Sequence, residues 1–414
     1  MACVTPKSVR PIALTLLLLP LILASGLTGV SCGSREQVLF GAVLPLTGEA
    51  AIYGTEIQKG IELAFEELQQ RKGAPKMVLE VVDSASDPEA AKEQLKKLYD
   101  QGARAVIGGV TTPEAMAMVP VAESSNRVLL SPSASTPELT DLSRNFYRVW
   151  PSDVREGSTM GSYAAKSLCS RAAILAAEST YAKGVQTVFA QTFEQEGGEV
   201  VELLEYPAQG IDLQPLVERV VGQKPECVYL ADYAEAIGRI IRLLDEAGYE
   251  GKILTVSAFA SPQAITEAGE LAEWVFITHP VYDAQDQENA MVQSFVQAYK
   301  AKYGTVPGLF AAHGYDAMLV LYEAMQKGGD SGRNFWKGMR SLKELQGVTG
   351  TLQFDEKGDV QKFPRVYFIL EGRLRDHQKY LEEEAQRLRE EYIRLQQEKR
   401  DLLKNRKDGE GGSD

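Results

Sequence analysis

Residues 38–54 read VLFGAVLPLTGEAAIYG, which describes an apolar strand, a turn and the beginning of an amphipathic helix. The strand ends at Pro45, the turn contains Thr47 and Gly48, and apolar residues then return at helical spacing. In open α/β sheets, ligands bind at the carboxyl ends of the strands, where backbone N–H groups and short polar side chains are free. The stretch therefore predicts an α/β fold with a ligand site beside this turn.

Strands and helices alternate along most of the chain. Further apolar strands are predicted at 77–83, 104–109, 128–131, 172–177, 199–205, 227–231 and 252–256. Their continuous apolar runs, with helical stretches between them, predict parallel sheets whose two faces are covered. Because the series restarts after Trp150 at a similar size, we expect two doubly wound, Rossmann-like lobes with a hinge and an interlobe cleft.

The segments after residue 284 are expected to complete these lobes. They are predicted to form helices at 286–303, 309–328 and 333–343, and then an antiparallel hairpin of TGTLQFD (349–355) with RVYFILEG (365–372). The predicted boundaries are 37–151 and 284–345 for the first lobe, and 152–283 and 346–374 for the second lobe.

A C-terminal helical extension is predicted at 375–405, followed by a disordered tail at 406–414. Leucine recurs every seven residues along one stripe of this helix, at Leu381, Leu388, Leu395 and Leu402. The facing stripe, Gln378, Ala385, Tyr392 and Lys399, is mostly polar. A coiled coil needs apolar residues on both stripes, so the alternative is a charged helix that leans on the body or is solvated.

Residues 1–31 have the pattern of a secretion signal. Lys7 and Arg10 precede a long uncharged, apolar run, and small residues precede Cys32. This pattern resembles a bacterial lipoprotein signal, in which Cys32 becomes the acylated N-terminus and anchors the protein to a membrane. A membrane-spanning helix is the alternative, which Pro20 and the short apolar core disfavour. We therefore expect an exported, lipid-anchored protein of the cell envelope or periplasm.

Composition and motifs disfavour several other classes of function. The net charge is −13, and becomes −15 without residues 1–31, which is unsuited to binding nucleic acid. The histidines His279, His313 and His377 are scattered, and no metal-ligand spacing, nucleophile elbow or Walker-type glycine loop is present. No enzyme activity, metal or cofactor is expected. Cys169 and Cys227 both precede predicted strands, so they form a disulfide in an exported protein or remain two buried thiols.

Three polar loops follow strands of the first lobe: TGEAAIYG (47–54), GGVTTPEA (108–115) and SPSASTPELTD (131–141). Each places Ser or Thr hydroxyls and backbone N–H groups near a helix start, where a carboxylate is stabilised. Helix capping accounts for one such loop, but three loops at one edge of a sheet predict a ligand site.

Six motifs occur along the chain in this order: GAVLPLTGEAAIYG, DSASDPEAA, VIGGVTTPEAMAMVPVAE, LLSPSASTPELTD, GYDAMLVLYEAM and GTLQFDEKGDV. From about Val38 to Arg373 the chain resembles the branched-chain amino acid ABC transporter substrate-binding family, which has the type 1 periplasmic binding-protein fold. The resemblance implies a protein that captures an amino acid or a related small carboxylate or amide by hinge closure and delivers it to a membrane permease. The alternative is an envelope lipoprotein that uses this fold as a ligand sensor or a scaffold for a protein partner.

The resemblance also implies which residues hold the ligand. The first lobe would bind a carboxylate through hydroxyls and backbone N–H groups of Thr112, Ser133, Ala134 and Ser135, beside Thr111 and with Tyr53 at the rim. The second lobe would contribute Tyr181 and Tyr233.

One position departs from the family pattern. The acid that binds the ligand's ammonium group in the family is replaced here by Ser257, and serine cannot neutralise a buried positive charge. Either Asp232 replaces that acid, or the ligand lacks an ammonium group. A third interpretation of Asp232 is capping of the helix at 233–247.

Overall fold

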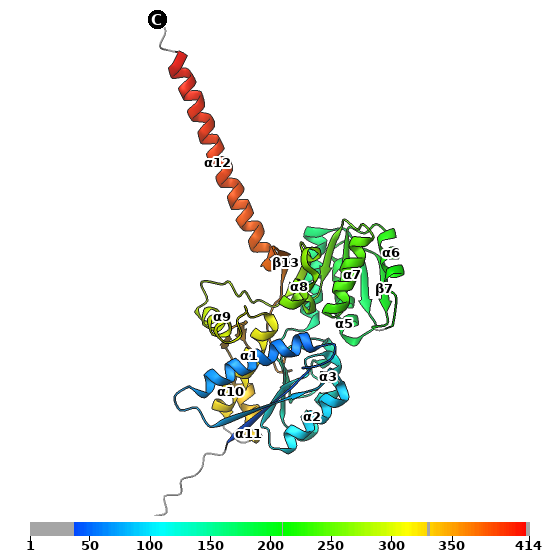
Figure 1. Cartoon of the computed structure of the whole chain (residues 1–414), viewed down its shortest axis with the longest axis vertical. Coiled ribbons are helices and arrows are strands. Elements are labelled where there is room, and N and C mark those ends of the chain that lie inside the picture. The colour runs from blue at the N-terminus through cyan, green and yellow to red at the C-terminus, as the bar shows by residue number, and fades with distance from the viewer. Residues whose placement is uncertain (1–36, 209, 329–331, 411–414) are drawn as a thin grey trace, which may run out of the picture. The chain divides into compact units, whose positions relative to one another are not determined.

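The computed structural model describes residues 37–208, 210–328 and 332–410. The predicted signal at 1–31 and the proposed lipid-attachment residue Cys32 lie outside these ranges. Within them, the chain forms two large sheets covered by helices (Figure 1).

The first sheet consists of five parallel strands in the order β2-β1-β3-β4-β5. They are β1 (Val38–Leu44), β2 (Met77–Asp83), β3 (Ala105–Gly108), β4 (Val128–Ser131) and β5 (Phe146–Arg148). Alternate side chains point to opposite faces. Phe40 and Leu44 pack on the core side of α1 (Ala51–Gln69) and α10 (Leu309–Gly328), and Val43 packs with α2 (Pro88–Asp100) and α3 (Thr112–Ser125) on the other face.

The second sheet has seven strands in the order β14-β13-β10-β9-β8-β6-β7. They are β6 (Arg171–Ala177), β7 (Glu199–Tyr206), β8 (Cys227–Ala231), β9 (Lys252–Thr255), β10 (Phe276–His279), β13 (Arg365–Leu370) and β14 (Arg373–Asp376). The five strands β6–β10 are parallel and repeat the strand order of the first sheet, whereas β13 and β14 are added antiparallel. The accompanying helices are α4 (Asp153–Tyr163), α5 (Thr180–Gln195), α6 (Gln214–Gly222), α7 (Ala234–Glu246) and α8 (Pro262–Ala268). Two doubly wound sheets confirm the predicted α/β fold.

The last part of the chain returns to the first sheet before it finishes the second. Helices α9 (Ala290–Tyr303), α10 and α11 (Gly332–Ser341) follow β10, and α1 packs against both α9 and α10. The chain therefore passes from one sheet to the other three times: after β5, after β10, and before β13.

The predicted hairpin of 349–355 with 365–372 is wrong. Its first segment forms β12 (Gly350–Leu352), which pairs with β11 (Leu345–Gly347), and its second segment forms β13, which pairs with β10 and β14. The turn between the two segments is held elsewhere, because Asp359 pairs with Arg148 at the end of the first sheet. Strands β5 and β10 were not among the predicted strands.

Cys169 and Cys227 are joined by a disulfide with a Cα–Cα distance of 6.1 Å. Cys227 begins β8, and Cys169 lies just before β6, so the bond links neighbouring strands at one end of the second sheet. Such a bond is typical of exported proteins.

The C-terminal helix α12 (His377–Glu410) runs further than predicted, so residues 406–410 are helical rather than disordered, and 411–414 lie outside the described ranges. Its first turn packs on the second sheet, where the Tyr380 ring lies 5.0 Å from that of Phe368. Beyond this turn the leucine stripe is exposed; Leu388 is 57% exposed and Leu402 is 70% exposed. None of the helices that the structure describes is sufficiently long and apolar to traverse a bilayer.

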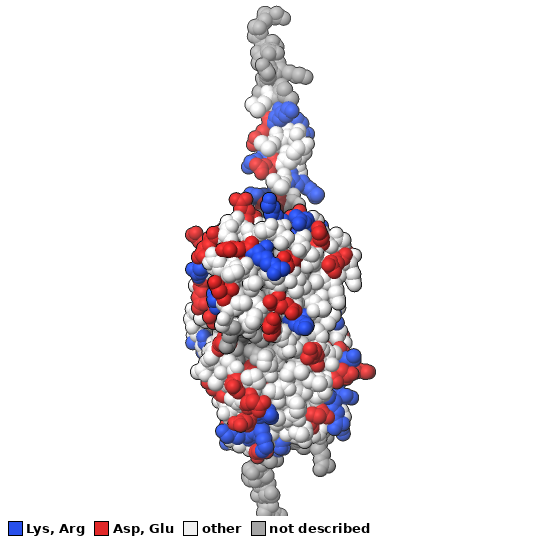
Figure 2. All heavy atoms as spheres, turned by 90° about the vertical axis from the view of Figure 1, so that its right-hand side faces the viewer, with Lys and Arg blue, Asp and Glu red and all other residues white. Residues whose placement is uncertain are grey.

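Charged side chains are mixed on the face of the molecule that Figure 2 shows. Lysine and arginine lie among aspartate and glutamate, and neither sign forms a continuous patch among the coloured residues of that face. This face lacks the basic track that proteins use to follow a nucleic-acid backbone.

Candidate ligand-binding site

A small cavity with about 30 Å³ of internal space lies where loops from the carboxyl ends of both sheets meet. Nine of the ten ligand-binding residues expected from the sequence line it: Tyr53, Thr111, Thr112, Ser133, Ala134, Ser135, Tyr181, Tyr233 and Ser257. Four further lining residues were missed: Val110, Trp150, Ala258 and Phe310. The position between two α/β lobes is typical of a small-molecule site.

The turn at Thr47, which the opening stretch placed beside the site, is not part of the cavity lining. The Thr47 hydroxyl donates a hydrogen bond of 2.7 Å to Asp83, at the end of β2. Because Asp83 also accepts bonds from the backbone of Leu46 and Thr47, its carboxylate holds this turn in place. The stretch reaches the cavity only through Tyr53, on the first turn of α1.

Hydrogen bonds of the Ser131 and Ser133 hydroxyls hold the loop after β4 in place. The Ser131 hydroxyl donates to the Gly109 carbonyl and accepts the backbone N–H groups of Ser133 and Ala134, at 3.3 and 2.9 Å. The Ser133 hydroxyl donates to the Val110 carbonyl at 2.7 Å. These bonds join the β3 and β4 loops. They also use the Ala134 N–H group, which is therefore engaged within the loop.

The two threonines of the loop after β3 have different roles. Thr111 caps α3: its hydroxyl accepts the Glu114 N–H, and the Glu114 carboxylate accepts the Thr111 N–H at 3.0 Å. Thr112 begins the helix, lines the cavity and is 2% exposed. Thr112 therefore lies at the positive end of α3, where an anion is stabilised.

Aromatic rings form the remaining wall of the cavity. The Trp150 and Phe310 rings stack with centroids 5.2 Å apart, and the Tyr53 ring lies 4.8 Å from that of Phe310. On the side of the second sheet, Tyr181 and Tyr233 stack at 5.2 Å. Burial raises the pKa of both tyrosines above the usual value, so their hydroxyls stay protonated.

The two lobes touch each other across the cavity. The Tyr53 hydroxyl, from α1, accepts the N–H of Ala234 at 2.8 Å, at the start of α7. The Ser261 hydroxyl donates a bond of 2.7 Å to the Glu56 carboxyl, which also lies on α1. Both bonds join elements of the first and second sheets, so the structure shows the lobes in a closed arrangement.

The Glu56 contact predicts a pH dependence of stability. Burial raises the pKa of this carboxyl from 4.5 to about 7, against the opposing effects of Ser261 and Lys59. Between these pH values the folded protein keeps a proton that the unfolded chain has released, so the free energy of unfolding falls as pH rises from 4.5 to about 7, by up to about 3 kcal/mol. Urea denaturation across this range is expected to show a flatter profile for Glu56→Gln. Equal slopes for the two proteins would contradict the assignment.

Asp232 is the predicted site residue that the structure places elsewhere. Its carboxylate accepts the Tyr206 hydroxyl at 2.8 Å and the Tyr233 N–H at 2.7 Å, and it does not line the cavity. It is also not the N-cap of α7, which is Tyr233. Neither the substitute acid nor the helix cap that the sequence suggested is observed at this position.

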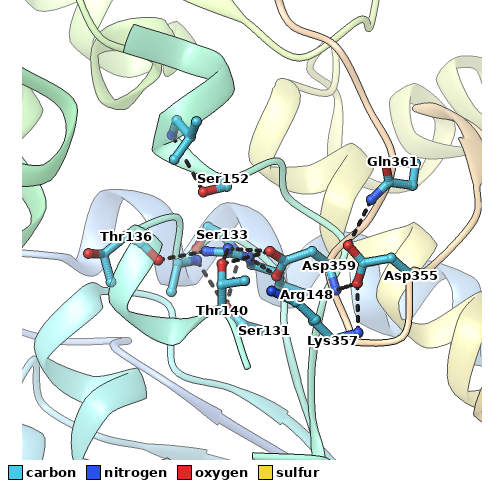
Figure 3. Close-up of polar contacts among 12 residues, drawn as sticks. Ser131, Ser133, Thr136, Thr140, Arg148, Ser152, Asp355, Lys357, Asp359 and Gln361 are labelled. Carbon is cyan, nitrogen blue, oxygen red and sulfur yellow. Dashed lines mark hydrogen bonds and ion pairs between the residues drawn. The ribbon is translucent and has the colours of Figure 1, made fainter. Parts of the chain in front are cut away.

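A buried ion pair supports the loop after β4 from behind (Figure 3). Arg148 is fully buried, and its guanidinium donates two bonds to the Asp359 carboxylate, at 2.6 and 2.9 Å. The same guanidinium donates to the Thr136 carbonyl and the Thr140 hydroxyl, at 2.9 and 2.7 Å. Arg148 thus ties the ligand loop to the third crossing between the sheets. Sequence reasoning missed it, because the partners are 211 residues apart.

The described residues contain no group of three or more His, Cys, Asp or Glu side chains placed to hold a metal ion. All the side chains that line the cavity are neutral. The site therefore offers hydroxyls, backbone N–H groups and aromatic surface, which suit a small carboxylate with an apolar part.

Comparisons with known proteins agree with this geometry. Residues 37–372 match the sequence profile of the family described as periplasmic binding protein. The chain is 26% identical over 325 residues to the leucine-, isoleucine-, valine-, threonine- and alanine-binding protein of Pseudomonas aeruginosa, which covers 77% of this chain and 86% of that protein. It is 25% identical over 340 residues to the Leu/Ile/Val-binding protein homolog 3 of Brucella melitensis, which covers 80% and 91%.

Solved structures share the fold. The leucine binding protein LivK of Thermotoga maritima superposes with a TM-score of 0.77 at 27% identity, covering 82% of this chain and 97% of that one. A solute binding protein of an ABC transporter from Rhodopseudomonas palustris, in complex with 3,4-dihydroxybenzoic acid, gives 0.75 at 24% identity, covering 82% and 95%. The chain therefore belongs to the periplasmic binding protein family, in agreement with its resemblance to the substrate-binding proteins of branched-chain amino acid ABC transporters.

Proposed function

We propose that this protein is the extracytoplasmic substrate-binding component of an ABC transporter and that it captures an amino acid or a related small carboxylate between its lobes. The observation that carries the proposal is the cavity itself, because its neutral lining combines hydroxyl groups with aromatic rings and includes Thr112 at the start of α3. A carboxylate would accept hydrogen bonds from Thr112 and Ser135, and the aromatic wall would cover the ligand's apolar part.

Capture would proceed by hinge closure. The ligand first binds the loops after β3 and β4, and the second lobe then closes over it with Tyr181 and Tyr233. Ligand contacts that exist only in the closed form favour closure. The closed form would be recognised by a permease, which is a separate chain. Because the family binds solutes for transport, the protein is not an enzyme.

The proposed location is the cell envelope, with Cys32 acylated after removal of residues 1–31. The disulfide between Cys169 and Cys227 supports export to an oxidising compartment. The lipid chains would hold the protein at a membrane surface close to the permease.

A second candidate function is a ligand sensor or a scaffold for a protein partner. The exposed leucine stripe of α12 favours it, because an apolar stripe of this kind is suited to pairing with another helix. In this case the ligand, if one binds, would regulate the partner rather than be transported.

A thermal-shift screen of amino acids, aliphatic carboxylates and aromatic carboxylates tests the proposal. A ligand at 100 times its Kd stabilises the folded state by about 2.7 kcal/mol, which corresponds to a rise in Tm of about 3–8 °C. We expect such a rise for at least one small carboxylate. No shift with any member of the panel would favour the scaffold function.

A further inference from the structure

Two buried carboxyl groups lie directly behind the neutral lining of the cavity. Asp153 and Glu156 are 0% and 1% exposed, and both belong to the first turn of α4. Their three-residue spacing puts them on one face of the helix. Each adjoins a lining residue: Glu156 is bonded to Ser257, and Asp153 lies beside the Ser135 side chain.

Glu156 is surrounded by hydrogen-bond donors. It accepts the Ser257 backbone N–H at 2.6 Å and the Ser257 hydroxyl at 2.8 Å, so that the two oxygens of its carboxylate hold one serine. The Thr278 hydroxyl adds a bond of 3.2 Å. Three donors on a buried carboxyl group stabilise its ionised form.

Asp153 has the opposite environment. Neither of its side-chain oxygens has a hydrogen-bond partner among the described residues. Burial and the neighbouring Glu156 raise the pKa of Asp153 well above the usual value, although Ser135 and Arg148 act in the other direction. Two adjacent buried carboxyl groups carry one negative charge at a lower free-energy cost than two, because like charges repel each other. Burial also raises the pKa of Glu156, but hydrogen bonds from Ser257 and Thr278 act in the other direction, so Glu156 is the carboxyl group whose surroundings favour the ionised form.

We propose that Ser257 and Glu156 together recognise a protonated amine, so that the ligand is a zwitterionic amino acid rather than an acid without an amino group. This inference rests on the proposed function and names the substrate class for the same cavity. Glu156 is a positioning residue in this scheme, because it acts on the ligand through Ser257.

The geometry explains how Ser257 can accept a hydrogen bond from a protonated amine. Since the Ser257 hydroxyl donates its only hydrogen to Glu156, its oxygen presents lone pairs to the cavity that it lines. The negative charge of Glu156 behind Ser257 strengthens the hydroxyl oxygen as an acceptor, because few groups screen that charge in surroundings of low polarity. Asp232 does not strengthen an acceptor in the cavity in this way, because its carboxylate oxygens already accept hydrogen bonds from the Tyr206 hydroxyl and the Tyr233 N–H.

Isothermal titration with matched pairs of ligands tests the inference. The pairs are leucine with 4-methylpentanoate and phenylalanine with 3-phenylpropanoate, whose members differ only in the amino group. We expect wild-type protein to prefer the amino acid of at least one pair. Glu156→Gln is expected to weaken binding of that amino acid by about 10- to 100-fold, because a charge-assisted interaction is lost, and to change binding of the amine-free acid by less than about 3-fold.

Two further variants separate recognition from folding. Glu156→Gln/Ser257→Asp places a carboxylate in the cavity lining without a second charge behind it, and is expected to recover most of the preference for the amino acid. Asp232→Asn is the matched control, since it removes another buried carboxyl beside the cavity, and its preference for the amino acid is expected to match that of the wild type.

The outcomes are distinct. Wild-type protein that binds the amine-free acids as tightly as the amino acids would overturn the inference and leave the proposed function standing. An equal loss for both members of a pair in Glu156→Gln would also overturn it, because this result means a structural role. Absence of binding by every member of both pairs would count against the proposed function itself, and the inference would fall with it.

Discussion

Replacing Arg148 with methionine is expected to lower the free energy of unfolding by about 3–5 kcal/mol. Arg148 is fully buried, and its removal leaves the Asp359 carboxylate without its bidentate partner in a largely buried position. Removing one member of a buried ion pair costs this much because the other charge stays in a medium that cannot solvate it. Equilibrium denaturation in urea, followed by circular dichroism, measures the loss.

An exposed ion pair supplies the control for this prediction. Lys96 and Asp100 are 69% and 67% exposed at their side chains, and their ion pair lies on the surface of α2. Lys96→Met is expected to cost less than about 1 kcal/mol, as is usual for surface pairs. If Arg148→Met cost no more than Lys96→Met, the buried ion pair would not stabilise the ligand loop.

The second large effect is expected at the proposed carboxylate site. Thr112→Val and Ser135→Ala each remove one hydroxyl from the cavity lining, and each is expected to weaken binding of the best ligand by about 10- to 100-fold. A hydrogen bond to a charged group contributes about 1.5–3 kcal/mol, which gives this range. Titration calorimetry with the ligand found in the thermal-shift screen measures the change.

Thr47→Val is the matched control for this pair. Thr47 was expected near the site from the sequence, but its hydroxyl binds Asp83 and does not line the cavity. The affinity of Thr47→Val is expected to stay within about twofold of the wild type. A loss as large as that of Thr112→Val would indicate a general effect of loop stability instead of direct contact.

Much of the fold follows from local sequence. Strand β8 and helix α10 have the predicted bounds, because each is a continuous apolar or amphipathic run with clear ends. The three polar loops converge because parallel strands end at the same edge of a sheet. Two of them supply most of the cavity lining in the first lobe.

The features that were missed depend on contacts between distant segments. Phe310 and Trp150 reach the cavity from the start of α10 and from the first crossing, and neither position has a local signal for ligand binding. Glu156 resembles an ordinary acidic residue in the first turn of a helix. Its partner Ser257 is 101 residues away, so only the folded chain brings them together. The wrong hairpin has the same cause, because the Arg148–Asp359 pair holds the turn between the two segments at the end of the first sheet.

The proposed function depends most on where a bound carboxylate lies, and a crystal structure of the protein with its tightest ligand tests this directly. We predict that the ligand's carboxylate lies within hydrogen-bonding distance of Thr112 and Ser135, with its apolar part against Trp150 and Phe310. A ligand bound outside this cavity, or a cavity filled by the protein's own side chains in the liganded crystal, would contradict the account.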